Sequence, residues 1–176
     1  MNKLFRILST DRLTLRPISL DDWEAILTIR SNPTINQYLD RKPCRSKDDA
    51  IEFIQQVQKN IAQNTSFYWA VTLTECKTVV GTICLFAFTD DRSSGEIGYE
   101  LLPSYHGKGI MAEAASAVID YAQVMLKIPK ILAFTHEENV ASIALLSKLN
   151  FIDTKTSDPE DEKMKCYAKV LNTCVT

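Results

Sequence analysis

The stretch that decides the fold is GEIGYELLPSYHGKGIMAEAA, residues 95–115. It begins with alternating apolar residues, as a strand does, continues through a turn that contains Gly107 and Gly109, and ends in a run of helix-forming residues. The chain has only five glycines, and two of them flank a single lysine in this turn. A strand, a glycine turn and a helix in this order predict a backbone that a ligand can approach closely.

A turn of this kind suits phosphate, because the first turn of a helix has N–H groups without internal partners and the helix dipole adds partial positive charge. Lys108 adds a cation beside them. Two common phosphate motifs do not match: the P-loop requires Ser or Thr where Gly109 stands, and the dinucleotide fingerprint requires glycine in place of Ala112. From the turn alone, a glycine pair that merely leads into a packed helix is an equal alternative.

Around this stretch, apolar periodicity predicts an alternation of strands and helices. Strands are expected at 12–18, 67–73, 79–88, 96–102, 130–135, 151–154 and 163–171. Helices are expected at 19–30, irregularly at 35–39, from Ser46 through Ile61, at 110–127 and at 139–149. No repeat or linker interrupts this order. We therefore expect one mixed sheet with helices on both faces, an α/β (α+β) fold that forms a single domain over residues 1–176.

Several side chains are predicted to form the core or to end helices. Asn150 is placed for a left-handed helix cap, and Trp23 and Trp69 are expected to be core anchors. The helix that begins at Ser46 has an inward face made of Ala50, Phe53, Ile54, Val57 and Ile61. The helix at 110–127 has an inward stripe made of Met111, Ala115, Val118, Ala122 and Met125.

The composition excludes several classes of function. A net charge of −2 disfavours nucleic-acid binding, and no segment approaches the ~20 apolar residues that a membrane span needs. With two histidines and no CxxC spacing, a metal site is not expected, and the odd number of cysteines is simplest in a reducing compartment. We expect a cytoplasmic protein; its cysteines are Cys44, Cys76, Cys84, Cys166 and Cys174.

Three segments together resemble one family, the GNAT superfamily of N-acetyltransferases. YELLPSYHGKGIMAEA resembles motif A, with Gly109 at its obligatory glycine and His106 and Met111 at positions that usually hold Gln or Arg and a small residue. NVASIALLSKLNF resembles motif B; its matches are Asn139, Ser142, Leu145, Lys148 and Phe151. TDRLTLRPISLDDWEAI resembles the start of the RimJ/RimL-like branch, which includes ribosomal-protein N-terminal acetyltransferases.

The resemblance implies a GNAT fold: a mixed, mostly antiparallel sheet of about seven strands, splayed between the fourth and fifth. It also implies an N-acetyltransferase that moves an acetyl group from acetyl-CoA to a primary amine by direct transfer in a ternary complex, without a metal. The pantetheine arm would pair with the edge Tyr99 to Leu101, opposite Ile131 to Thr135. The residues implied to bind acetyl-CoA are Tyr99, Leu101, His106, Gly107, Lys108, Gly109, Ile110, Met111, Asn139 and Ser142.

Candidate catalytic residues follow from the chemistry of amine attack on a thioester, which needs a base and a proton donor. Glu96 resembles the family's acidic residue on this strand, and Glu100, on the same face about 13 Å away, is the alternative base. Either could instead be a half-exposed strand charge, and the family resemblance also leaves open a solvated route with no dedicated base.

For the donor, the motif B tyrosine is replaced by Leu146. Ser142 is the expected donor toward the thiolate, with Tyr99 and Tyr105 as weaker alternatives. Ser142 could instead bond its own helix backbone, and Asn139 could simply cap that helix. His136, after the strand at 130–135, is either a proton shuttle or a surface histidine.

The acceptor is less well defined. The expected acceptor-binding segments are 32–45 and 156–162, and the second carries four acidic residues that suit a cationic amine or form a solvated loop. Expected acceptors are a protein N-terminus, a polyamine or another small amine, bound by a monomer or homodimer. Two alternatives remain open: a non-catalytic acyl-CoA-binding sensor and a nucleotide-binding protein.

Overall fold

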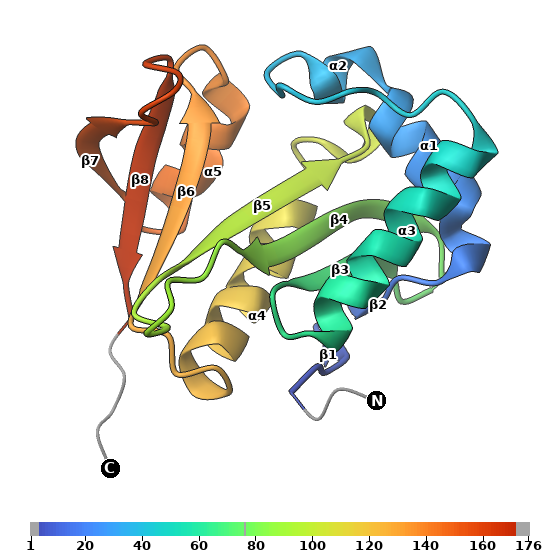
Figure 1. The fold of residues 1–176 in the computed structure, drawn as a ribbon, viewed down its shortest axis with the longest axis horizontal. Helices are drawn as coiled ribbons and strands as arrows, with labels where there is room; N and C mark the ends of the chain where they lie inside the picture. The colour runs from blue at the N-terminus through green and yellow to red at the C-terminus, as the bar shows by residue number, and fades with distance from the viewer. Residues whose placement is uncertain (1–3, 76, 172–176) are drawn as a thin grey trace.

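The computed structural model describes residues 4–75 and 77–171, so Cys76 and Cys174 lie outside the described residues. Within these ranges one sheet contains eight strands in the order β1-β2-β3-β4-β5-β6-β8-β7 (Figure 1). Neighbouring strands are antiparallel except β5 and β6. The sequence prediction of a mixed, mostly antiparallel sheet is confirmed.

The strands are β1 (Leu8–Ser9), β2 (Leu13–Pro17), β3 (Phe67–Leu73), β4 (Val79–Phe86), β5 (Gly95–Leu101), β6 (Lys130–His136), β7 (Ile152–Ser157) and β8 (Met164–Val170). The helices are α1 (Trp23–Ser31), α2 (Pro33–Asn36), α3 (Lys47–Ala62), α4 (Ile110–Val124) and α5 (Val140–Lys148), with 3-10 turns at Leu20–Asp22 and Pro103–Tyr105. All seven predicted strands are present, and β1 is an additional short one. No helix in the described ranges is long and apolar enough to cross a membrane.

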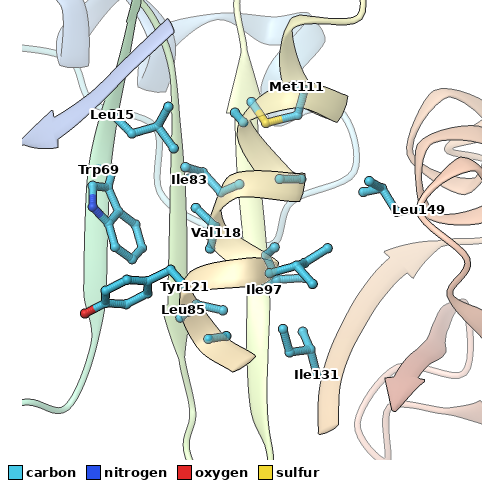
Figure 2. Close-up of a cluster of buried hydrophobic side chains, with 14 of the residues drawn as sticks. Leu15, Trp69, Ile83, Leu85, Ile97, Met111, Val118, Tyr121, Ile131 and Leu149 are labelled. Carbon is cyan, nitrogen blue, oxygen red and sulfur yellow. The ribbon is translucent and has the colours of Figure 1, made fainter. Parts of the chain in front are cut away.

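The helices cover opposite faces of the sheet (Figure 1). On one face, α4 and α5 pack on the larger core, in which Trp69, Ile83 and Val118 are fully buried (Figure 2). On the other face, α1 and α3 pack on β3 through a smaller cluster that contains the predicted inward residues of α3. Helices therefore lie on both faces of the sheet, as the order of elements predicted.

Two details of the predicted helices are wrong. The irregular helix expected at 35–39 is α2, which begins at Pro33 because the Asn32 side chain accepts hydrogen bonds from the backbone N–H groups of the next turn. The helix at 110–127 ends at Val124, so Met125 leaves the inward stripe and is 41% exposed. After a left-handed residue at Lys127, Ile128 fills the core instead.

The splay between β5 and β6 is the feature that positions the site. The two strands pair only at Gly95 with Ile131 and at Glu96 with Leu132, and then diverge (Figure 1). β5 stays paired with β4 up to Leu101, and β6 stays paired with β8 along its length. The edge of β5 beyond Glu96 therefore has no strand neighbour on the β6 side, as expected from the family resemblance.

Candidate functional site

The turn between β5 and α4 has the backbone that its glycines predicted. Gly107 and Gly109 have φ angles of 71° and 74°, a left-handed conformation in which a side chain is strained. A Cβ added at Gly107 would meet nothing within 4 Å, so the φ angle rather than lack of space favours glycine there. The turn thus presents open backbone.

The start of α4 leaves donors in this turn. Gly109 is the N-cap, and the first backbone bond of the helix runs from Glu113 N to Gly109 O at 3.1 Å. The N–H groups of the intervening first turn are not used inside the helix. The Lys108 ammonium lies 5.4 Å from the centre of the Tyr105 ring, beside the same turn. Backbone donors, a helix N-terminus and a cation fit the oxygens of a pyrophosphate group.

Arg12 stabilises this turn, and this contact was not predicted from the sequence. Its guanidinium donates to Lys108 O at 3.0 Å and binds the Glu113 carboxylate at 2.6–2.7 Å. In a trans peptide, C=O and N–H point in opposite directions, so the bond to Lys108 O aims the N–H of Gly109 away from Arg12. The Glu113 pKa is lowered, because hydrogen bonds from Thr10 and Arg12 outweigh its burial.

Two candidate proton donors meet across the splay. The Tyr99 hydroxyl on β5 lies 2.8 Å from the Ser142 hydroxyl on α5. Burial raises the pKa of Tyr99 to about 12, against the opposing effect of the bond to Ser142, so the phenol stays protonated at neutral pH. Leu146, at the usual tyrosine position, is fully buried in the core. α5 therefore has no tyrosine hydroxyl at position 146. The Tyr99 hydroxyl of β5 lies beside Ser142 of α5 instead.

The neighbouring predicted binding residues have local partners. The Asn139 side chain accepts from Ser142 N at 3.1 Å, so it caps α5. His106 Nε2 lies 2.9 Å from Leu101 O, which ties the turn to the end of β5. Asn139 therefore caps the start of α5, and His106 contacts the end of β5; both elements border the splay.

The two candidate bases have different surroundings. Glu96 is half-buried beside the closed end of the splay, and burial raises its pKa, with a further rise from the charge of Asp158 in the β7–β8 loop. Glu100 accepts a short hydrogen bond from Arg41 and lies 3.9 Å from Arg30 Nη1. Glu96 has the environment of a proton acceptor, whereas Glu100 is already paired with cations.

The two segments expected to bind the acceptor border this region. Arg41 and Tyr38 come from 32–45; the Tyr38 ring stacks on His136 with centroids 5.1 Å apart. His136 Nδ1 accepts from Glu138 N at 3.2 Å. Asp158 belongs to 156–162 and acts on Glu96 through its charge. Tyr105 packs at the margin of the core.

The structure thus brings Tyr99, Ser142 and Asn139 together and separates Glu96 from Glu100. The contacts that sequence reasoning missed join distant segments: Arg12 to the glycine turn, Arg30 and Arg41 to β5, and Tyr38 to His136. A signal in the sequence existed only for Arg12, which lies in the matched N-terminal stretch, and for Tyr38 and Arg41, which lie in the expected acceptor segment; Arg30 lies in neither. Over residues 4–75 and 77–171, no three His, Cys, Asp or Glu side chains could hold a metal.

A comparison with family models matches residues 12–152 to the acetyltransferase (GNAT) domain. "Uncharacterized N-acetyltransferase YoaA" of Bacillus subtilis is 33% identical over 148 residues, 84% of each chain. The spermidine N(1)-acetyltransferase of Escherichia coli K12 is 24% identical over 144 residues, 81% of this chain and 74% of that protein.

Among solved structures, the fold is similar to that of RimL, the ribosomal L7/L12 α-N-protein acetyltransferase, in complex with coenzyme A. The TM-score is 0.86 at 18% identity, and the match covers 96% of this chain and 99% of that one. The two proteins therefore share a fold.

Proposed function

Because the chain belongs to the acetyltransferase (GNAT) family and is an N-acetyltransferase, we propose that it moves an acetyl group from acetyl-CoA to a primary amine by direct transfer in a ternary complex. The observation that carries this proposal is the splay, in which β5 leaves β6 after Glu96 and runs into the glycine turn. One continuous path thus joins a free strand edge to a set of backbone donors.

The residues of this path fit the two polar parts of acetyl-CoA. The turn at 106–111 would bind the pyrophosphate through backbone N–H groups, with Lys108 adding charge. The edge from Tyr99 to Leu101 would pair with the amides of the pantetheine arm, and Asn139 and Ser142 border the same path. When bound, acetyl-CoA supplies an activated acetyl group on sulfur. RimL, a relative of the same fold, was solved with coenzyme A, which supports this cosubstrate.

Glu96 is our proposed general base. As the nitrogen–carbon bond forms and the carbon–sulfur bond breaks, the amine must lose a proton, and Glu96 accepts it directly or through water. Its raised pKa makes it a better proton acceptor than an exposed glutamate. Glu100 remains the alternative, but its carboxylate is paired with Arg41.

The Tyr99–Ser142 pair is our proposed proton donor. The two hydroxyls lie 2.8 Å apart, so one can donate a proton to the departing thiolate while the other donates to it in turn, and the pair then regains a proton from solvent. The high pKa of Tyr99 keeps a proton available across the physiological range. Ser142, the expected donor, would then act as one member of a pair.

The acceptor belongs to the class of primary amines. Spermidine and the α-amine of ribosomal L7/L12 are the acceptors named for two relatives, and both a protein N-terminus and a small amine remain candidates here. The test is an assay with a broad amine panel that detects free coenzyme A thiol and acetylated amine together. We expect both products in equal amounts with at least one amine; stabilisation by acetyl-CoA without any turnover would instead favour a sensor.

A further inference from the structure

Three charged side chains form a cluster on the α1–α3 side of β5. Arg30 lies in the last turn of α1, Arg41 follows α2, and Glu100 lies on β5; we call these the arginine–glutamate cluster. Glu100 binds Arg41, and Arg30 Nη1 lies 3.9 Å from the same carboxylate oxygen. The side chains are only 16%, 17% and 14% exposed, in that order.

Polar atoms of this cluster lack partners among the described residues. Arg30 Nε, Arg41 Nη2 and Glu100 Oε2 are buried and make no hydrogen bond. An unsatisfied buried polar atom destabilises a fold by about 1–3 kcal/mol, and more when it is charged. A concentration of such atoms beside a proposed active site points to a group that binds there.

The donors and charges of the cluster identify that group. Two guanidinium groups face one carboxylate, so the cluster carries one uncompensated positive charge. Both arginines have an unused N–H donor, whereas only one acceptor oxygen is unused. Arginine forks match the paired oxygens of a carboxylate. A polyamine would instead place further positive charge beside two guanidinium groups that share a single carboxylate.

The cluster also sets a distance from the reacting amine. Glu100 is four residues beyond Glu96 on β5, about 13 Å by strand rise. An amine beside Glu96 and an anion beside Arg41 would then lie about 13 Å apart, a distance that about three or four residues of extended peptide span. Next to Arg30 an open hollow of about 330 Å³ continues outward between α1, α3 and the 42–44 segment, with room for the rest of such a chain.

We infer that the acceptor is a peptide-like amine with a carboxylate on its third or fourth residue, and that Arg30 and Arg41 bind that carboxylate. This inference rests on the proposed acetyl transfer, because it assigns the amine to the side of Glu96. It predicts that an N-terminal peptide with an acidic third residue is preferred over its amide counterpart and over spermidine.

The test is calorimetric binding to the protein saturated with coenzyme A, which needs no turnover. The probes are the tripeptide amides Ser-Ala-Asp-NH2 and Ser-Ala-Asn-NH2, together with spermidine. We expect the Asp peptide to bind roughly tenfold or more tightly than the Asn peptide, because one charge-assisted contact is replaced by a neutral one.

Variants of the two arginines test whether the arginine–glutamate cluster causes the preference for the Asp peptide. Arg41→Gln and Arg30→Met should each reduce the preference for the Asp peptide to less than about threefold while leaving binding of the Asn peptide and of coenzyme A unchanged. Glu100→Gln should keep or enlarge the preference, since it frees the arginines. Arg45→Gln is the matched control: it removes an exposed charge from the same segment and should keep the preference.

Equal binding of the two peptides, no binding of either, tighter binding of spermidine, or a preference that survives in Arg41→Gln and Arg30→Met would each overturn the inference. A different outcome would reject the proposed acetyl transfer. If the peptide preference holds but no amine in the panel is acetylated, the carboxylate site stands and the catalytic proposal is rejected.

Discussion

Glu96 and Glu100 are the same amino acid on the same strand, yet their neighbours give them different chemistry. Glu96 is half-buried, and its burial and the charge of Asp158 both raise its pKa. Glu100 sits between two arginines. Sequence spacing predicted that the two could not serve one amine, and the surroundings now favour Glu96 as the base and Glu100 as part of the acceptor site.

Replacement of Glu96 tests this assignment. We expect Glu96→Gln to lower kcat by about 100-fold or more, with little change in the KM for acetyl-CoA, because only proton removal is lost. In the wild type, activity should fall toward acid pH with a midpoint above the ordinary glutamate pKa of about 4.3. The reason is that a Glu96 with a raised pKa stays protonated, and inactive as a base, up to a higher pH. The fall in activity toward acid pH should be absent in Glu96→Gln and present in Glu100→Gln. Near-normal turnover of Glu96→Gln would rule Glu96 out.

The Tyr99–Ser142 pair is tested by a double-mutant cycle. Tyr99→Phe and Ser142→Ala should each reduce kcat, and the double variant should be little worse than the more damaging single variant, because the two hydroxyls act as one donor. The KM for acetyl-CoA should change little in all three. Strictly additive losses in log kcat would show that the hydroxyls work independently and contradict the proposal.

At the scale of the element, α4 depends on a contact from far away in sequence. The glycines give its N-terminus an open turn, but Arg12 on the β1–β2 side fixes the direction of the peptide between Lys108 and Gly109 and neutralises Glu113. An uncompensated carboxylate in the first turn would repel a bound phosphate. Arg12 is therefore a positioning residue for the proposed pyrophosphate site.

Replacement of Arg12 should weaken the binding of coenzyme A. We expect Arg12→Gln to raise the Kd for coenzyme A by roughly five- to tenfold, since one charged hydrogen-bonding partner of the turn is lost. The kcat at saturating acetyl-CoA should stay close to that of the wild type. Arg6→Gln, which removes an exposed arginine from the same end of the chain, should bind coenzyme A normally. Unchanged binding in Arg12→Gln, measured by calorimetry, would contradict the role.

The start of α1 depends on an ion pair between the buried Asp22 carboxylate and the partly exposed Arg16. The Asp22 carboxylate accepts from Arg16 at 2.6 and 2.8 Å and from Ser19 N at 2.8 Å. Burial by itself would raise the Asp22 pKa, but these hydrogen bonds outweigh it and the pKa is lowered. The stability from Asp22 is therefore complete above the ordinary aspartate pKa of about 3.9 and is lost as pH falls through the lowered native value.

Asp22→Asn should therefore destabilise the protein by about 3 kcal/mol at neutral pH, because it breaks an ion pair whose carboxylate is buried. The difference from the wild type should shrink as pH falls below the ordinary aspartate pKa of about 3.9 and through the lowered native pKa of Asp22. Denaturant unfolding over this pH range measures both, with the exposed Asp21→Asn as the control. A difference that is absent at neutral pH, or that does not change with pH, would contradict this account of the helix start.

At the scale of the whole molecule, the sequence predicted much more of the fold than of the site. Apolar periodicity gave all seven main strands and the order of helices, because periodicity reports which face of an element is buried. It could not identify polar partners that meet only after folding. Arg41 and Glu100 are 59 residues apart, Tyr99 and Ser142 are 43 apart, and Arg12 and Glu113 are 101 apart.

The helix ends were also beyond local patterns. Met125 continues the apolar period of α4, but the chain turns at Lys127 and the deep position goes to Ile128. The glycine turn, by contrast, was predictable in both place and conformation, because positive φ angles restrict the choice of residue strongly.

The central claim is that the splay and the glycine turn together carry acetyl transfer from acetyl-CoA to an amine. The most direct measurement is a mass-spectrometric search for the acetylated product in an amine panel that includes the Asp tripeptide, run with wild type and Glu96→Gln. The account predicts a singly acetylated amine in step with free thiol for the wild type, and little of either for the variant. Equal product with both proteins, or none with the wild type although coenzyme A binds, would contradict it.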